Sequence, residues 1–159
     1  MKVKIIMIIY IFTAFSFLFG QERNSLTIDE ATKATASYLS ERIPIGTKVA
    51  IVNFTASKEV SDYVVSELTS RLVNNGNFTV VDRYSLKLIE REMNFQLSGE
   101  VSDESAQAIG KKLGAQIIIS GNLKPFGNSY RMEIKALQIE TARIQGNEIY
   151  TIRKDTVIN

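Results

Sequence analysis

The fold is decided by the stretch that opens with Val80-Val81-Asp82-Arg83 and closes with Ile117-Ile118-Ile119-Ser120-Gly121. Between these segments the apolar residues recur every three or four positions, once before Ser98-Gly99 and once after it, as on amphipathic helices. The run that closes at Gly121 has the length and composition of a strand buried on both faces. The stretch therefore predicts a strand, two helices and a strand, in that order.

Residues that commonly start and end helices bound the second of these helices. Ser102 can accept a hydrogen bond from the first free N–H groups, and Gly114 can adopt the left-handed conformation that ends a helix. Leu86 and Ile89 lie on one face of the first helix, which starts after Asp82. Asp82 is interpreted as the cap of that helix. A ligand contact at the end of the parallel strands is the alternative.

A further strand and two further helices are predicted upstream. Residues 48–54 form an apolar run of strand length, and a helix with an apolar residue every fourth position follows, ending at Gly76. A strand, a helix and a strand in this order favour a right-handed crossover and parallel pairing. Thr27 and Glu30 can form the capping box of an earlier helix that ends near Pro44. Its face holds few large apolar residues, which predicts peripheral packing.

The C-terminal part predicts an antiparallel meander. Pro125-Phe126-Gly127-Asn128 has turn chemistry, so residues 130–139 should return antiparallel to a strand at 116–123. The alternation of apolar residues breaks at Leu137, which indicates a β-bulge, and a last strand covers about residues 143–152. The predicted fold class is α/β in the broad sense (α+β), a single domain with a mixed sheet of about five strands and flanking helices.

Residues 1–20 have the pattern of a secretory signal peptide. Lys2 and Lys4 precede an apolar run that is shorter than the ~20 residues needed to span a bilayer. We predict cleavage after Gly20 and export to the periplasm or cell envelope. A retained anchor is the alternative, because Leu18 is bulky for a cleavage site. Gln21 stands where a lipoprotein carries its acylated cysteine, so no lipid anchor is predicted.

The rest of the chain is predicted to consist of a helical segment at residues 21–46 and a main domain at residues 47–155.

The composition of the sequence excludes several function classes. The chain has no cysteine and no histidine, which removes disulfides, thiolate sites, the commonest general base and the commonest zinc ligand. Lys2 and Lys4 are two of the 19 basic residues, and the other 17 balance the 17 acidic ones. No cofactor, metal or nucleic-acid partner is predicted.

Carboxylates are the remaining common route to catalysis, and the sequence holds two candidate pairs. Glu90 and Glu92 are two positions apart on a predicted helix, so they do not face each other. Asp103 and Glu104 fit the favourable interaction of acidic residues with a helix N-terminus. Both pairs are interpreted as structural, and the protein is predicted not to be an enzyme.

Residues 77–121 resemble the CsgG/LpoB family and, more distantly, the N-terminal domain of TolB. The resemblance rests on Val80-Val81-Asp82-Arg83, Gln96 with Ser98-Gly99, and Leu113-Gly114-Ala115 followed by Gly121. It implies that these motif residues have mainly structural roles, with a contribution to an interface as a further option. They are Asp82, Arg83, Gln96, Ser98, Gly99, Gly114 and Gly121.

The resemblance implies a non-catalytic protein of the bacterial envelope. One branch of the family forms outer-membrane pores that secrete curli subunits. The other docks onto a penicillin-binding protein and activates peptidoglycan synthesis. This sequence lacks the cysteine of the second branch and the inserted alternating segments of the first. The resemblance therefore implies an exported protein that binds and regulates an envelope partner, a penicillin-binding protein. An accessory subunit of a secretion complex, including a homo-oligomer, is the alternative.

Overall fold

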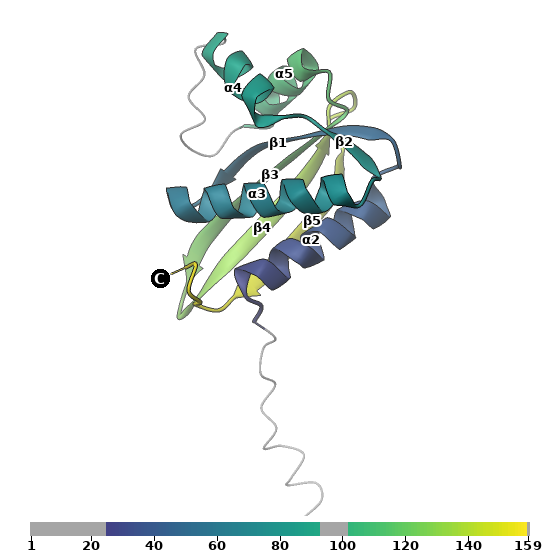
Figure 1. Cartoon of the computed structure of the whole chain (residues 1–159). Coiled ribbons are helices and arrows are strands. Elements are labelled where there is room, and N and C mark those ends of the chain that lie inside the picture. Colours follow the sequence, from purple (N-terminus) through teal and green to yellow (C-terminus); the bar gives the residue numbers. More distant parts are fainter. Residues whose placement is uncertain (1–24, 93–101, 159) are drawn as a thin grey trace, which may run out of the picture.

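Five strands form one mixed sheet in the order β2-β1-β3-β4-β5 (Figure 1). The computed structural model describes residues 25–92 and 102–158. Its strands are β1 (Thr47–Thr55), β2 (Phe78–Val80), β3 (Ile117–Phe126), β4 (Ser129–Gln138) and β5 (Ile144–Ile152). β1 pairs in parallel with β2 and β3, whereas β3, β4 and β5 form an antiparallel meander. The predicted fold class, strand number and strand directions are confirmed.

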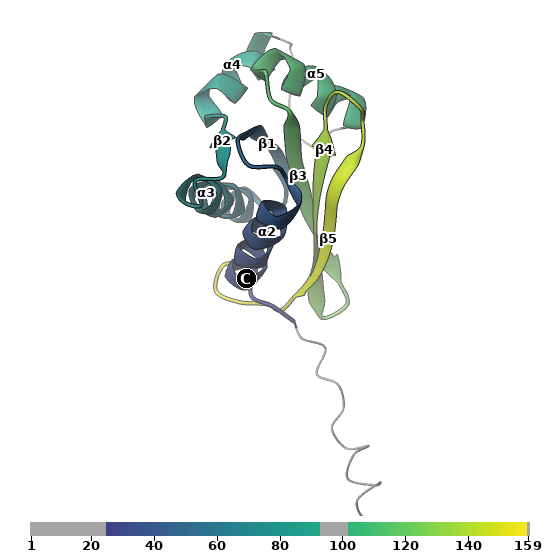
Figure 2. The same ribbon diagram turned by 90° about the vertical axis from the view of Figure 1, so that its right-hand side faces the viewer.

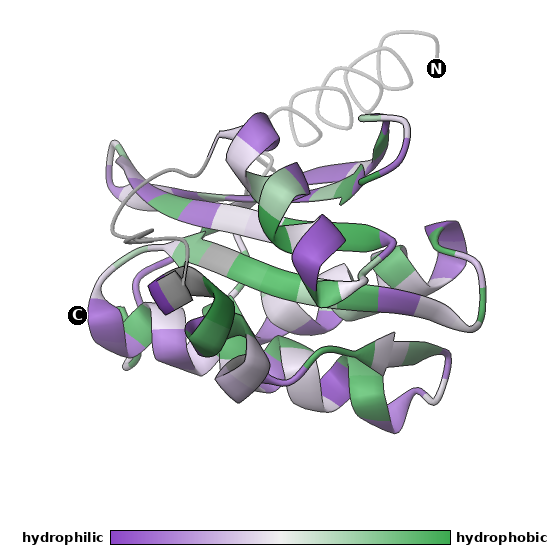
Figure 3. Cartoon of the chain, turned by 90° about the horizontal axis from the view of Figure 1, so that it is seen from above, coloured by the Kyte–Doolittle hydropathy of each residue, from purple (hydrophilic) through white to green (hydrophobic). Residues whose placement is uncertain are grey.

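The helices of the described residues cover the sheet from two sides. They are α2 (Ile28–Arg42), α3 (Lys58–Asn74), α4 (Arg83–Glu92) and α5 (Asp103–Leu113). α2 and α3 lie side by side on one face, and α4 and α5 pack together at one end of the molecule (Figures 1 and 2). Along these helices hydrophobic residues alternate with hydrophilic ones (Figure 3), as expected for helices with one buried side.

The sheet separates two hydrophobic clusters. Val49 and Ile119 point toward α2 and α3, whereas Ala50 and Ile118 belong to the cluster under α4 and α5. All four side chains are at most 1% exposed. Because β1 and β3 are buried on both faces over this part of their length, their sequences are continuous apolar runs. This is why the two central strands were recognisable from the sequence.

α2 is an integral part of the larger cluster, so the prediction of a peripheral helix is wrong. Ile28, Ala31 and Leu39 are at most 1% exposed, and Thr32 and Thr35 are fully buried. The two threonine hydroxyls donate hydrogen bonds of 2.7 and 2.8 Å to the carbonyls of Ile28 and Ala31. Small polar residues are thereby buried without unsatisfied hydrogen-bonding groups. The prediction failed because it counted only the large apolar residues of the helix.

The predicted helix caps are confirmed, but the turn after β3 is shorter than predicted. The Thr27 hydroxyl accepts a hydrogen bond from the Glu30 N–H, and the Glu30 carboxylate accepts one of 2.7 Å from the Thr27 N–H. Ser102 caps α5 as predicted, and the structure adds Ser57 as the cap of α3. Pro125 and Phe126 belong to β3, and only two residues, 127 and 128, form the turn. The φ of 60° at residue 127 is typical of such tight hairpins.

β5 is an outer strand whose free edge is partly occupied by groups from the N-terminal side of the domain. The Tyr38 hydroxyl accepts a hydrogen bond of 3.1 Å from the Asn147 N–H and donates one of 3.3 Å to the Asn147 carbonyl. Leu26 pairs through its backbone with the Thr151 carbonyl and the Arg153 N–H, at 2.9 Å each. Unpaired strand edges invite pairing with other chains, so these contacts protect part of this edge. The predicted β-bulge lies between Ala136 and Leu137 in the pairing of β4 with β5.

Candidate functional site

Asp82 lies at the junction of β2 and α4, and it caps that helix as predicted. Its Oδ1 atom accepts hydrogen bonds of 2.8 and 3.0 Å from the N–H groups of Tyr84 and Ser85. Its Oδ2 atom accepts one of 2.5 Å from the Ser85 hydroxyl. The hydroxyl bond of Ser85, followed by the two backbone bonds, holds the pKa of Asp82 below its usual range. A contact of Asp82 with a partner stays a prediction.

The first turn of α4 is expected to loosen at acid pH or when Asp82 is replaced. A carboxylate whose pKa is lowered in the folded state stabilises that state at pH values above the unfolded pKa of about 3.9. This contribution is lost as the pH falls through the pKa of the folded state. Asp82→Ala should therefore accelerate hydrogen exchange at the amides of Tyr84 and Ser85 at neutral pH, measured by NMR. Asp82→Asn should keep the cap without the acid-dependent loss. Unchanged exchange in Asp82→Ala would contradict this role.

A hollow of about 440 Å³ lies beside Asp82, and the side chains of Lys48 and Lys112 line it. The Lys48 ammonium, which lines it, donates a hydrogen bond of 2.8 Å to the Leu113 carbonyl at the end of α5. A cation at this position is favourable because the C-terminus of a helix carries partial negative charge. Lys112 lines the same hollow from the last turn of α5. The Asp82 carboxylate and the Lys48 ammonium thus have structural partners.

Two glycines of the motif have structural reasons to be glycine. Gly114 ends α5 in the left-handed conformation, with φ 62°, where a side chain is strained. A Cβ atom on Gly121 would lie 2.6 Å from the Glu133 carbonyl oxygen and 2.9 Å from a ring carbon of Phe54. Of the other motif residues, Arg83 begins α4. Gln96, Ser98 and Gly99 lie outside the described residues.

Both candidate carboxylate pairs lie on helices. Asp103 and Glu104 both lie in the first turn of α5, and Asp103 forms an ion pair with Lys135 of β4. Glu90 and Glu92 lie within α4. Within residues 25–92 and 102–158, no group of three or more Asp or Glu residues is placed to hold a metal ion. None of the helices in these ranges combines the length and apolar composition that a membrane crossing requires.

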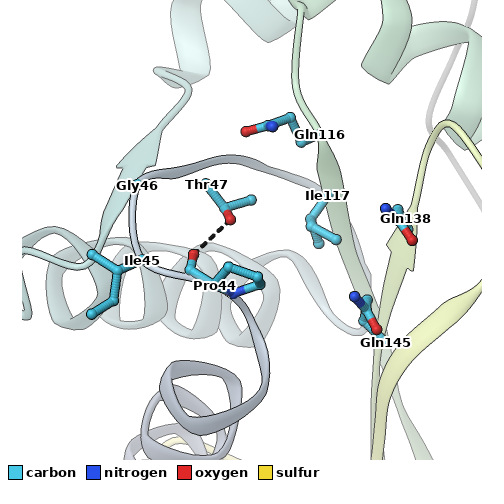
Figure 4. A pocket seen from close by; sticks show the side chains of 8 residues that line it. All are labelled: Pro44, Ile45, Gly46, Thr47, Gln116, Ile117, Gln138 and Gln145. Carbon is cyan, nitrogen blue, oxygen red and sulfur yellow. Dashed lines mark hydrogen bonds between the residues drawn. The ribbon is translucent and has the colours of Figure 1, made fainter.

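A second hollow, of about 270 Å³, opens at the end of the sheet where β1 and β3 begin (Figure 4). Thr47, Gln116, Gln138 and Gln145 line it together with apolar residues, and none of its lining side chains is ionisable. Gln116 accepts a hydrogen bond of 2.9 Å from the Lys48 N–H. This hollow offers amide and hydroxyl groups for contacts but no general acid or base.

The sequence matches one protein family over most of the folded part. Residues 34–136 correspond to the family described as curli production assembly/transport component CsgG. This chain belongs to the CsgG family. The matched range runs from the middle of α2 into β4, so it includes the whole parallel part of the sheet. The chain matches no curated protein sequence significantly.

Solved structures of LpoB share the fold of this CsgG-family protein. The LpoB C-terminal domain from Salmonella enterica gives a TM-score of 0.67 at 16% identity, over 80% of this chain and 98% of that domain. The same domain from Escherichia coli gives 0.66 at 16% identity, with the same coverage. The NMR structure of Escherichia coli LpoB gives 0.65 at 15% identity, over 86% of this chain and 73% of that protein. The resemblance to the CsgG/LpoB family is confirmed, and at these identities the structural likeness establishes the fold.

Proposed function

We propose that this CsgG-family protein is a non-catalytic regulator of the cell envelope that binds a penicillin-binding protein and activates peptidoglycan synthesis. The observation that carries the proposal is that its fold matches nearly the whole LpoB C-terminal domain. The signal-peptide pattern of residues 1–20 supports an envelope location. The absence of histidine and cysteine from the sequence supports a role without catalysis.

A protein without catalytic groups regulates an enzyme by binding one of its conformations more tightly than the others. The folded domain of this chain is suited to that task, because the close packing of its sheet and helices holds the surface residues in fixed positions. The proposal therefore requires a defined contact surface and a partner with an inactive and an active state.

The proposal is tested by reconstitution. Purified penicillin-binding proteins of the same organism are assayed for glycan polymerisation and peptide cross-linking, with and without residues 21–159. We expect binding to one of them and a several-fold faster reaction. An unrelated exported protein of similar size serves as the control. No binding to any of these enzymes, or binding without a change in rate, would contradict the proposal.

A second candidate function is an accessory subunit of an outer-membrane secretion complex of the CsgG type. The match of residues 34–136 to the CsgG family favours it. Light scattering on the purified protein and identification of its cross-linked partners in cells separate the two functions. Closed oligomers or recovery of outer-membrane secretion components would favour the accessory subunit. A monomer cross-linked to a penicillin-binding protein would favour the regulator.

A further inference from the structure

The sequence contains one asparagine that is followed by glycine, Asn75-Gly76, directly after α3. Both residues are exposed. An asparagine side chain is attacked most easily by the backbone nitrogen of the next residue when that residue is glycine. Glycine has no side chain to block the approach, and its backbone rotates most freely. Every other asparagine except the last residue is followed by a residue with a side chain. The local sequence therefore makes Asn75 the asparagine most open to this attack.

The reaction that follows from this attack is deamidation. Hydroxide removes the proton of the Gly76 nitrogen, which forms a bond to Cγ of Asn75, and the bond between Cγ and Nδ2 breaks. The side-chain nitrogen takes up a proton from water and leaves as ammonia, and a cyclic imide remains. A water molecule then opens the imide at either carbonyl, which gives aspartate or isoaspartate at residue 75. Water and hydroxide are the only other reactants.

The folded backbone opposes the closure of this ring. The Gly76 N–H donates a hydrogen bond of 3.0 Å to the Val73 carbonyl, so the proton that must leave is held in place. The ψ angle of Asn75 is −21°. This angle turns the Gly76 nitrogen away from Cγ, so the peptide plane must rotate before the ring can close. A Cβ atom added to Gly76 would meet nothing within 4 Å, so there is room for the rotation once the last turn of α3 opens.

Hydrogen bonds anchor the chain on both sides of the bond that must rotate. The Asn75 Nδ2 atom, which is the leaving nitrogen, donates a hydrogen bond of 2.6 Å to the Ser40 hydroxyl of α2. That hydroxyl donates one of 2.8 Å to the Ala36 carbonyl. On the other side, the Asn77 carbonyl accepts a bond of 2.7 Å from the N–H of residue 46. α2 and α3 lie side by side (Figure 1), so the contact with Ser40 joins the two helices.

We propose that Asn75 is a deamidation site whose rate is set by the contact of its side chain with Ser40. The reaction proceeds from a locally opened form in which the end of α3 has left α2, because protected backbone groups react through such openings. The product carboxylate lies at the C-terminus of α3, where the helix already carries partial negative charge. It also has no N–H to donate to Ser40, so deamidation weakens this contact. The inference goes beyond the proposed function and does not depend on it.

The first test follows deamidation in the full chain, purified and incubated at mildly alkaline pH. Aspartate and isoaspartate at each asparagine are quantified by peptide mapping with mass spectrometry. We expect residue 75 to convert faster than any other asparagine, and more slowly than in the same chain unfolded in urea. No conversion at residue 75, faster conversion at another asparagine, or equal rates in the folded and unfolded chain would overturn the inference.

The second test removes the contact with α2. Ser40→Ala should deamidate about fivefold faster at residue 75, which is the factor that one hydrogen bond of ordinary strength contributes to a local equilibrium. Ser37→Ala is the matched control, because it makes the same change at an exposed position of α2 and leaves the bond between Asn75 and Ser40 intact. Ser40→Thr keeps a hydroxyl and should retain the slow rate. Equal rates in Ser40→Ala and Ser37→Ala would overturn the role of the contact.

Small additions of urea separate local opening from global unfolding. Local opening exposes little surface, so urea below the unfolding transition should leave the deamidation rate of the unchanged protein and of Ser40→Ala nearly constant. A rate that rises with urea in proportion to the globally unfolded fraction would place the reaction in the unfolded chain. That result would overturn the inference even if Ser40→Ala deamidates faster.

Discussion

Replacing Gly121 with alanine should lower the free energy of unfolding by about 3 kcal/mol, at the upper end of the range for overpacking a protein interior. The added Cβ would lie 2.6 Å from the Glu133 carbonyl oxygen, 2.7 Å from Cδ1 of Ile134 and 2.9 Å from a ring carbon of Phe54. Side-chain atoms can rotate away, but the carbonyl belongs to the paired backbone of β4. The contact can therefore be relieved only by separating β3 from β4 where they pair.

The matched control for this variant is Ser120→Ala, one position earlier in β3. Ser120 faces the other side of the sheet, so its replacement should change the free energy of unfolding by only about 0.5 kcal/mol. Urea denaturation followed by circular dichroism measures both variants. If the free energies of unfolding of the two variants differ by less than about 1 kcal/mol, the sheet accommodates the methyl group. The inference that packing requires glycine at residue 121 would then be wrong.

Gly114 and Gly121 show which motif residues can be interpreted from sequence. Gly114 follows a helix and precedes a strand, so its left-handed conformation follows from local sequence. The crowding at Gly121 depends on Glu133 and Phe54, which lie in two other strands. Sequence reasoning placed Gly121 in the motif but offered no physical reason for it. Only the pairing of β1, β3 and β4 provides one.

The length of β3 was underestimated for a related reason. From Ile119 to Lys124 the sequence of β3 alternates apolar or glycine residues with polar ones, which is the signal of a strand with one solvated face. Pro125 and Gly127 were instead interpreted as one turn, which shortened the predicted strand. How much of the sheet α5 covers depends on where this helix packs. That packing is a tertiary property, which no local pattern contains.

The hollow shown in Figure 4 could not be predicted from the sequence, for a simpler reason. Thr47, Gln116, Gln138 and Gln145 come from the ends of four different strands or their connections. None of these residues has an unusual local sequence. They converge because β1 and β3 start at the same end of the sheet, where β4 ends.

A chain that begins at Thr47 should fail to fold, although the sequence placed the start of the main domain there. Without residues 1–46, the sheet and α3 would expose the apolar surface that α2 covers. β5 would also lose the edge contacts of Tyr38 and Leu26. The burial of Ile28, Ala31 and Leu39 shows how closely α2 packs on the rest of the domain. The truncated chain is expected to give a poorly dispersed NMR spectrum, and a chain that begins at Ser25 a dispersed one.

A milder test of the same point is the substitution Leu39→Ala in the chain that begins at Ser25. Leu39 is fully buried, and such truncations cost about 2–5 kcal/mol because they lose apolar contacts and leave a cavity. The exposed Lys33→Ala on the same helix is the control, with an expected change of about 0.5 kcal/mol or less. A dispersed spectrum of the chain from Thr47, together with a loss below about 1 kcal/mol in Leu39→Ala, would make α2 a detachable segment. The opposite result would make α2 part of the domain, so that any surface presented to a partner depends on the N-terminal helix remaining in place.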